Sequence, residues 1–354
     1  MLEGSFSAQL RDFDLNVENF TVRDGETLAL IGENGAGKST VLRILSGILK
    51  PASGKISLNG RTLYDSNARV LLPPEDRRIG YMFQNYALFP HMTAKENIAY
   101  GLKVQNASQT DIDARVGELC ERMGLSEVAD QRVTRMSGGQ RQKTALARAL
   151  APKPELLLLD EPLSALDVRT QEQMRRELAS VIRAEQIPCI LVTHSLVDAL
   201  SFANRIAVIE RGRIVASGLP EEMIHNPING FMSTFSENLN LFRGKVVVNR
   251  SGVVCVDVGG VKIRAATALS GTVSVGIRPE ELIISRERFV SSAINSFTGM
   301  ITKIEDTGLY RLVHVDIGIP LAASVTQQSI ERLGLATGQT VAVTFKATAV
   351  QVFI

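Results

Sequence analysis

The stretch that decides the fold is Thr27-Leu-Ala-Leu-Ile-Gly32-Glu-Asn-Gly-Ala-Gly-Lys38-Ser39-Thr40. It opens with a continuous apolar run of the length of a buried strand. The glycine-rich part that follows matches the pattern G-x-x-x-x-G-K-[ST]. Residues 39–49 then place apolar side chains at helical spacing. A strand, a glycine loop and a helix in this order predict the opening of an α/β nucleotide-binding fold.

This loop has the chemistry of a phosphate site. Glycines let backbone N–H groups converge on phosphate oxygens, and the N-terminus of the helix adds its dipole. Lys38 is placed to reach the β- and γ-phosphates, and the Ser39 hydroxyl can ligate Mg²⁺. The predicted nucleotide-binding residues of the loop are Gly32, Asn34, Gly35, Ala36, Gly37, Lys38, Ser39 and Thr40.

A second motif ends another apolar run. Four leucines, residues 156–159, predict a buried strand that delivers Asp160 and Glu161 to its carboxyl end. Ligands of open α/β sheets bind at that edge. We predict that Asp160 holds Mg²⁺ and that Glu161 polarises an attacking water.

A third motif is Ser137-Gly138-Gly139-Gln140, directly before a helical pattern. Its hydroxyl and free N–H groups could cradle a second anion. Alone, such a triplet is more typical of an ordinary helix N-cap. Two isolated residues, Gln84 and His194, would by themselves also be read as structural.

The order and spacing of these motifs resemble the nucleotide-binding subunit of ABC transporters over about residues 1–230. The resemblance implies a P-loop ATPase core of class α/β, with a helical subdomain near 90–150. It also makes Gln84 the Q-loop glutamine, His194 the switch histidine, and the segment Ser164–Asp167 the D-loop. The catalytic residues implied are Lys38, Gln84, Glu161 and His194, and the metal ligands are Ser39, Gln84 and Asp160.

In that family two subunits pair head to tail and bury two ATP molecules with Mg²⁺. Each ATP would be held by the loop and Asp160 of one subunit and by Ser137, Gly138, Gly139 and Gln140 of the other. The family usually stacks adenine on an aromatic residue ahead of the first core strands. Here Leu10 occupies the nearest place, and Phe13 is the nearest aromatic candidate.

The segment from Tyr86 to Ile98 resembles importer subunits that serve a separate solute-binding protein. The resemblance implies two integral-membrane permease subunits as partners, with the ATPase peripheral on the cytoplasmic face of the membrane. The apolar residues 88–90 fit either a groove for the permease or an internal core segment.

The pattern changes near residues 231–240. We predict an ATPase domain over 1–235 and a β domain over 236–354, because short alternating Val- and Thr-rich runs replace the helical patterns. Residues 273–285 resemble residues 341–353, which predicts two related OB-like barrels, about 241–290 and 295–354. Chance similarity among Val-rich strands is the alternative.

The β domain resembles the TOBE/Mop-like domains of molybdate/tungstate import ATPases. The resemblance implies an oxyanion site that inhibits the ATPase, with hydrogen-bond donors suited to a tetrahedral anion. Ile294 stands where that family commonly has Arg, and a structural, dimerising barrel without ligand is the alternative. The predicted oxyanion residues are Ser292, Asn295, Ser296, Thr326, Ser329, Lys346 and Ala347.

Composition and the lengths of the apolar runs bear on the possible partners of the chain. The chain has 354 residues, 45% of them hydrophobic, and a net charge of +2, which does not suggest a nucleic-acid partner. Three separated cysteines form no paired motif. No apolar run approaches membrane-spanning length, and the first residues do not read as a signal peptide.

Three alternatives to molybdate or tungstate import remain open. The first is an import ATPase for sulfate, ferric ion, polyamine or sugar. The second is a soluble ABC ATPase of DNA repair or translation, which the single cassette disfavours. The third is an oxyanion sensor with a vestigial ATPase, which the complete set of motif residues disfavours.

Overall fold

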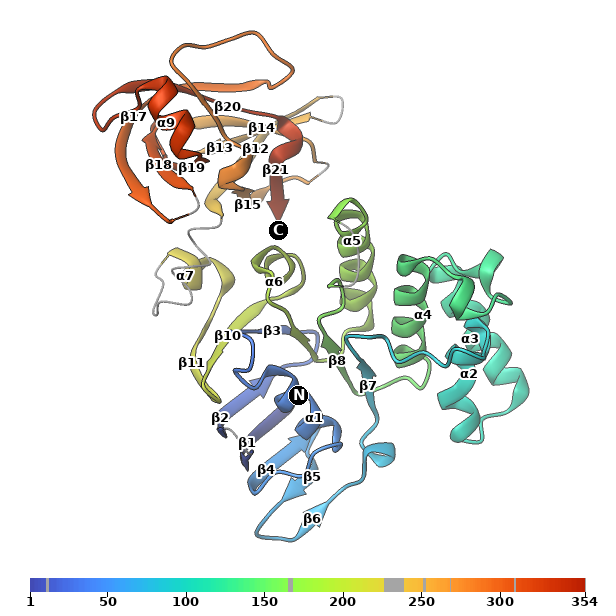
Figure 1. Cartoon of the computed structure of the whole chain (residues 1–354). Coiled ribbons are helices and arrows are strands. Elements are labelled where there is room, and N and C mark those ends of the chain that lie inside the picture. Colours follow the sequence, from blue (N-terminus) through green and yellow to red (C-terminus); the bar gives the residue numbers. More distant parts are fainter. Residues whose placement is uncertain are drawn as a thin grey trace. The chain divides into compact units, whose positions relative to one another are not determined.

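The computed structural model describes residues 1–10, 13–164, 168–225, 239–250, 253–267, 269–308 and 310–353. Its contacts divide the chain into two compact units, Met1–Pro220 and Glu221–Ile354. The first unit is a mixed α/β structure, and the second is built mainly of antiparallel strands (Figure 1). The predicted domain boundary at residue 235 lies outside the described residues.

The centre of the first unit is a parallel sheet with the strand order β10-β3-β9-β8-β7. Its strands are β3 (Thr27–Ile31), β7 (Ile79–Met82), β8 (Leu156–Asp160), β9 (Cys189–Val192) and β10 (Arg205–Glu210). All residues of β3, β8 and β9 are buried. Continuous burial is what parallel strands covered on both faces require, and it explains the unbroken apolar runs.

Six further strands extend this sheet beyond β10. They are β1 (Leu2–Gln9), β2 (Asp14–Val22), β4 (Ser53–Leu58), β5 (Arg61–Asp65), β6 (Val70–Leu71) and β11 (Arg213–Gly218). The complete order is β6-β5-β4-β1-β2-β11-β10-β3-β9-β8-β7. Pairing in this part is antiparallel, apart from a single parallel pair between β2 and β11.

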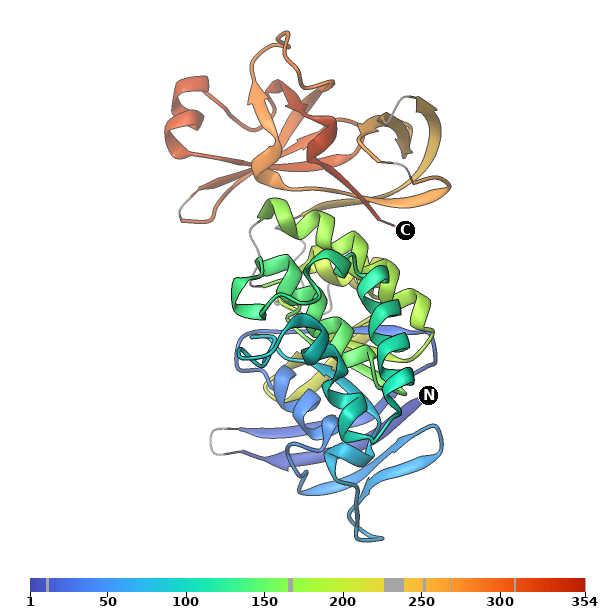
Figure 2. The ribbon, with the colours of Figure 1, turned by 90° about the vertical axis from the view of Figure 1, so that its right-hand side faces the viewer.

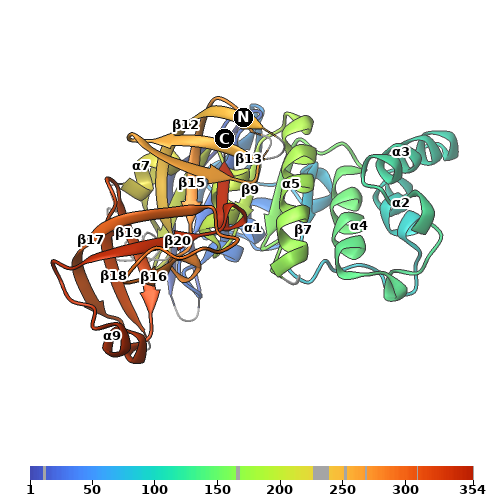
Figure 3. The same cartoon turned by 90° about the horizontal axis from the view of Figure 1, so that it is seen from above.

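Over the described ranges, six helices connect strands of this sheet, and a seventh, α7, follows its last strand. They are α1 (Lys38–Ser46), α2 (Ala94–Val104), α3 (Gln109–Arg122), α4 (Gly138–Leu150), α5 (Val168–Glu185), α6 (Leu196–Phe202) and α7 (Pro220–His225). Helices α2, α3 and α4 form the helical group that the sequence predicts near 90–150. Figures 1 and 3 show α4 beside α5, with α2 and α3 farther out, and in Figure 2 this group faces the viewer.

Local sequence explains where α2 and α4 begin. Thr93 and Glu96 form a capping box at α2, and Ser137 and Gln140 form one at α4. In each box the hydroxyl accepts from a backbone N–H, and the longer side chain accepts from the N-cap N–H. Among the described residues, no helix is both long and apolar enough to span a membrane.

The second unit contains two five-stranded antiparallel sheets. Their orders are β14-β13-β12-β15-β21 and β16-β20-β17-β18-β19. The first sheet has β12 (Asn240–Arg250), β13 (Val253–Val258), β14 (Val261–Ala265), β15 (Thr272–Ile277) and β21 (Val350–Phe353). The second has β16 (Ile283–Ser285), β17 (Asn295–Asp306), β18 (Arg311–Asp316), β19 (Pro320–Val325) and β20 (Thr340–Phe345). A short helix, α9 (Gln327–Leu333), follows β19.

The boundaries predicted for the two barrels are wrong for one strand in each. Strand β16 falls in the predicted first barrel but pairs with β20 of the second sheet. Strand β21 falls in the predicted second barrel but pairs with β15 of the first sheet. The structure supports the internal repeat. A 3₁₀ turn follows both β15 and β20, and the strand after each turn, β16 or β21, pairs with the other sheet. The exchange lets both sheets share one apolar core.

Candidate functional site

Four neighbouring parallel strands deliver the predicted catalytic residues to one edge of the first sheet. The phosphate loop follows β3, Gln84 follows β7, and His194 follows β9, while Asp160 ends β8. The register places Asp160 beside Val192, which also pairs with Leu30. Carboxyl ends of adjacent parallel strands meet at one edge, so residues far apart in sequence become neighbours.

The phosphate loop is shaped for close backbone approach. Gly37 has φ +106°, and a Cβ on Gly32 would lie 2.2 Å from the carbonyl oxygen of Ile209. Helix α1 begins without a side-chain cap and without an acidic residue in its first turn. Its first N–H groups are therefore available to an anion, which is the requirement for phosphate binding at a helix N-terminus.

Lys38 lies folded over this loop. Its Nζ donates to the carbonyl oxygens of Gly32, at 2.8 Å, and Glu33, at 2.9 Å. Burial lowers the pKa of Lys38, and the carboxylates of Glu161 and Asp160 oppose that shift. A cation held between backbone carbonyls and two acidic groups is well placed to exchange those contacts for phosphate oxygens.

Asp160 is buried and has two hydroxyl partners. Ser39 donates to its Oδ1 at 3.0 Å, and Tyr81 donates a long bond to its Oδ2 at 3.4 Å. Burial is the main cause that raises the pKa of Asp160, and the nearby Glu161 raises it further. The pairing of Ser39 with Asp160 agrees with the predicted metal ligands. Tyr81 was missed because a lone tyrosine in a strand carries no motif.

Glu161 stands at the centre of the predicted catalytic group. Its backbone is left-handed, with φ +45°, which is uncommon for a residue with a long side chain. Gln84 donates to Oε2 at 3.0 Å, and His194 Nδ1 lies 3.2 Å from Oε1. The structure therefore brings Gln84, Glu161 and His194 together, although 77 residues separate Gln84 from Glu161.

Sequence analysis also missed the residue that caps the far end of α1. The fully buried Arg77 donates from its Nη1 to the carbonyl oxygens of Ile44, at 2.9 Å, and Leu45, at 2.7 Å. Burial lowers the pKa of Arg77 to about 10. A cation at a helix C-terminus satisfies orphan carbonyls and complements the dipole, so Arg77 fixes the helix on which Lys38 and Ser39 stand.

Ser137, Gly138, Gly139 and Gln140 lie at the start of α4. Ser137 and Gln140 bond to each other in the capping box, and Gly139 is buried. Within the described part of the chain, no hydrogen bond joins these residues to Lys38 or Asp160. Ser164 donates to the carbonyl of Glu161 at 3.0 Å, while Asp167 lies outside the described residues.

The adenine-stacking candidates lie close to the loop. Phe13 is half-buried and packs against the phosphate loop, since a Cβ on Gly37 would lie 3.1 Å from its ring. Leu10 donates its N–H to the carbonyl of Phe13 at 3.1 Å. Phe13 therefore lies against the base of the loop, and residues 11 and 12 between the two candidates lie outside the described residues.

The structure divides the predicted oxyanion residues into groups. Asn295 is buried, and its amide exchanges two hydrogen bonds of 2.8 Å with the backbone of Arg264. Thr326 and Ser329 bond to each other at the start of α9, which follows β19. Strand β18 lies between β19 and β17. The end of β19 next to Thr326 lies near Asp306, the last residue of β17, whereas Asn295 is the first residue of β17.

The remaining oxyanion candidates lie near the start of β17 and the end of β20. Ser296 pairs with Thr344, Ala347 accepts a bond from the Ala266 N–H, and Ser292 and Lys346 are exposed. Within the described part of one chain the candidates fall into two groups, and the oxyanion site stays a prediction. Antiparallel register separates Thr326 and Ser329 from the other residues that the family resemblance had grouped.

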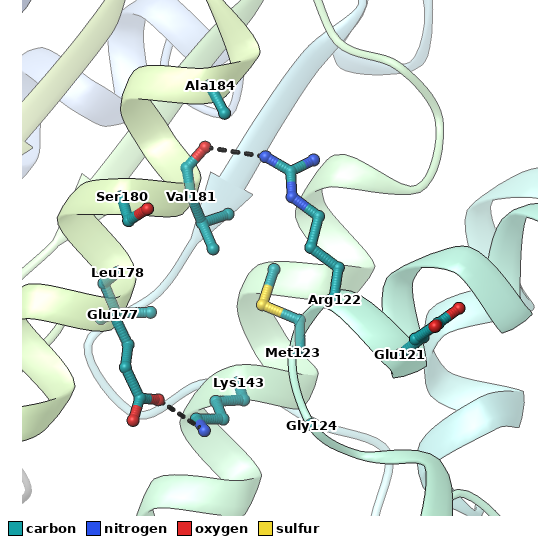
Figure 4. A pocket seen from close by; sticks show the side chains of 10 residues that line it. All are labelled: Glu121, Arg122, Met123, Gly124, Lys143, Glu177, Leu178, Ser180, Val181 and Ala184. Carbon is teal, nitrogen blue, oxygen red and sulfur yellow. Dashed lines mark hydrogen bonds and ion pairs between the residues drawn. The ribbon is translucent and has the colours of Figure 1, made fainter.

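A cavity of about 540 Å³ lies apart from the predicted site (Figure 4). It opens between the end of α3, the side of α4 and the length of α5. Lys143 forms a 2.6 Å ion pair with Glu177 across it, and Arg122 donates to the carbonyl of Val181 at 3.1 Å. None of its lining residues is a predicted site residue.

The residues present fit Mg²⁺ and a nucleoside triphosphate. The loop offers N–H donors and Lys38 to phosphates, while Ser39 and Asp160 offer oxygens 3.0 Å apart. Mg²⁺ is commonly held by one or two side-chain oxygens together with substrate phosphates. Glu161 lies at the same edge, and its carboxylate is a group that can accept a proton.

Comparison with known proteins identifies the family. The family described as ABC transporter matches residues 15–164, and the TOBE domain matches residues 291–352. The molybdate/tungstate import ATP-binding protein WtpC of Pyrococcus abyssi is 37% identical over 99% of this chain and 98% of its own. The putrescine transport ATP-binding protein PotG of Escherichia coli is 36% identical over 90% of this chain and 85% of its own.

Solved structures agree for the first unit. A dimeric ATP-binding cassette in a post-hydrolysis state with ADP and Pi has a TM-score of 0.52 and 27% identity. It covers 62% of this chain and 99% of its own. A subunit of an ABC transporter complex from Clostridium perfringens has a TM-score of 0.57 at the same identity, covering 64% and 91%. The predicted fold, nucleotide and enzyme class are thereby confirmed, and the chain belongs to the ATP-hydrolysing, ATP-binding subunits of ABC transporters that carry a C-terminal TOBE domain.

Proposed function

We propose that this chain powers the import of molybdate or tungstate through partner permease subunits, from the cytoplasmic face of the membrane. The observation that carries the proposal is the 37% identity to molybdate/tungstate import ATP-binding proteins across 99% of the chain. That match includes the second unit as well as the first. A solute-binding protein would deliver the anion to the permease.

The phosphates of ATP would bind at the N-terminus of α1. Lys38 would leave the carbonyls of Gly32 and Glu33 for the β- and γ-phosphates. Ser39, Asp160 and Gln84 would hold Mg²⁺, which supplies charge neutralisation for the phosphate oxygens. Arg77 keeps α1 in place from its other end.

Hydrolysis would depend on Glu161 as the base for the attacking water. Gln84 and His194 contact separate carboxylate oxygens of Glu161, and so fix its orientation. A base held from two sides loses little free energy to reorganisation when the proton moves. His194 would also contact the γ-phosphate at the same edge of the sheet.

We further propose that a second copy of the chain completes each ATP site. Ser137–Gln140 stand at the N-terminus of α4, on the helical group, and have no hydrogen bond to the phosphate loop within the described part of the chain. A head-to-tail homodimer would place this helix terminus on the γ-phosphate of the partner's ATP.

Uptake in a strain that lacks the gene tests the proposal. The intact chain should restore accumulation of radioactive tungstate and molybdate, whereas Lys38→Ala, made at equal abundance, should not. Lys55→Ala, a change in a surface residue of β4, is the matched control and should restore uptake fully. The strain without the gene could instead take up tungstate and molybdate normally and lose the uptake of polyamine, sulfate, ferric ion or sugar. That result would show that the transported solute is a different one, while the chain would still be an import ATPase.

A further inference from the structure

The segment after Gln84 contains a strained turn. Tyr86 and Ala87 both have left-handed backbones, with φ +62° and +45°, and neither is glycine. The Tyr86 N–H donates to the carbonyl of Phe83 at 2.8 Å, which closes a turn around Gln84 and Asn85. Two consecutive strained residues persist only where their surroundings hold them.

One side chain from another element holds this turn. Arg148 of α4 donates from Nη1 to the carbonyl of Ala87 at 2.7 Å and from Nη2 to that of Tyr86 at 2.8 Å. Its guanidinium also lies over the ring of Phe89, 5.5 Å from the centroid. The planar fork of an arginine can make these contacts together, which a lysine cannot.

Neighbouring contacts fix the two ends of the segment. The buried Asn97 accepts from the Phe89 N–H at 2.8 Å and donates to its carbonyl at 3.2 Å. At the other end the ring of Phe83 stacks on Tyr81, with centroids 4.1 Å apart. Between these anchors, Arg148 alone among the described side chains bonds to the carbonyls of the strained turn.

We propose that Arg148 is a positioning residue for ATP hydrolysis, which holds the Tyr86–Ala87 turn and thereby sets Gln84 against Glu161. Gln84 lies inside the turn that Tyr86 closes, and its amide reaches Glu161 at 3.0 Å. Arg148 also stands on the helix that begins at Ser137. It therefore ties the Gln84 turn to the helix that would face the partner's ATP. This inference rests on the proposed roles of Gln84 and Glu161.

A double-mutant cycle on the full chain tests the inference. Arg148→Met should lower kcat for ATP by about 10- to 100-fold, because a catalytic group misplaced by about 1 Å can cost up to about 100-fold, and KM should change by less than about 2-fold. Gln84→Ala should have a similar effect, and the double variant should be no slower than the slower single variant. Arg148→Lys should recover only part of the loss. The inference would be overturned if the two losses of kcat multiplied in the double variant, or if kcat were unchanged in Arg148→Met or in Gln84→Ala.

Arg115→Met is the matched control. Arg115 also donates to a backbone carbonyl of α4, that of Leu150 at 3.0 Å, but it does not contact the turn. The kcat of Arg115→Met should match that of the intact chain. A loss of kcat in Arg115→Met equal to that in Arg148→Met would overturn the inference.

Amide hydrogen exchange of the nucleotide-free chain gives a readout independent of hydrolysis. Exchange over residues 84–89 should quicken in Arg148→Met and not in Arg115→Met, and unchanged exchange in both would overturn the inference. If Arg148→Met behaves as stated while Glu161→Gln keeps full activity, the positioning role stands and the proposed base is wrong.

Discussion

Glu161 is the residue on which the geometry of the predicted catalytic group converges. Its left-handed backbone turns the carboxylate away from the strand direction, toward Gln84 and His194. Strain of this kind costs about 1–3 kcal/mol and is found at functional sites. Asp160, one residue earlier, faces Ser39 instead. Two adjacent carboxylates therefore have different partners, which suits different roles.

Glu161→Gln should bind ATP with nearly the affinity of the intact chain and lose most hydrolysis. A glutamine keeps the size of the side chain but cannot accept a proton, so a loss of about 100-fold or more is expected. Calorimetry with ATP and a phosphate-release assay measure the two effects. Glu155→Gln, which removes the charge of a half-buried carboxylate that pairs with Arg61 and Arg78 and does not contact Glu161, should keep full activity. Hydrolysis at the normal rate in Glu161→Gln would remove the assignment of the base.

At the scale of elements, two asparagines hold the second unit together. Asn240 begins β12 and Asn295 begins β17, and each pairs with the end of a corresponding strand, at Ile277 and Phe345. Each buried amide bonds to the backbone of an edge strand in the other sheet. Asn240 donates to the carbonyl of Ala322 at 2.9 Å and accepts from its N–H at 2.6 Å. The internal repeat thus reproduces a structural bond as well as a pattern of strands.

Asn240→Ala and Asn295→Ala should each destabilise the second unit by about 2 kcal/mol, because buried backbone groups would lose their partners. Thermal unfolding of the full chain measures the change. Met300→Ala removes an exposed side chain from β17 and should cost much less. Equal stability of the Asn295→Ala variant and the intact chain would show that the amide is dispensable and restore it as a candidate ligand.

At the scale of the whole molecule, the second unit is one cooperative body built from two exchanged halves. The last strand, β21, completes the first sheet, and the short β16 completes the second. Their residues Val350 and Ile284 are buried in the core that both sheets share. Each half of the repeat therefore needs a strand from the other half to complete its sheet.

Deletion of residues 350–354 should loosen the first sheet, although most of that sheet lies about 100 residues earlier in the chain. The deletion leaves the edge of β15 without its partner and opens the shared core. Hydrogen exchange should quicken in β15 and, through the core, in β20, while β3 and β8 keep their protection. Faster exchange confined to the residues next to the cut would mean that the halves fold independently. A chain extended by five residues serves as the control.

The sequence by itself determined the nucleotide-binding core, the order of its motifs and the presence of a β-rich second part. These features depend on local requirements: glycines where backbone approaches closely, unbroken apolar runs in strands buried on both faces, and alternation in the β domain. The resemblance built on those motifs was confirmed for family, fold and enzyme class, while the roles of single site residues remain predictions.

Only the tertiary structure decided which isolated residues matter and which strands pair. Arg77, Tyr81 and Arg148 belong to no motif, and their roles come from backbone and carboxylate partners 32 to 79 residues away in sequence. Strands β16 and β21 have the same pattern in either sheet, so composition could not assign them. Asn295 has the chemistry of an anion ligand, but long-range register turned its amide toward Arg264. A side chain's chemistry is local, whereas its partner is set by the packing of distant segments.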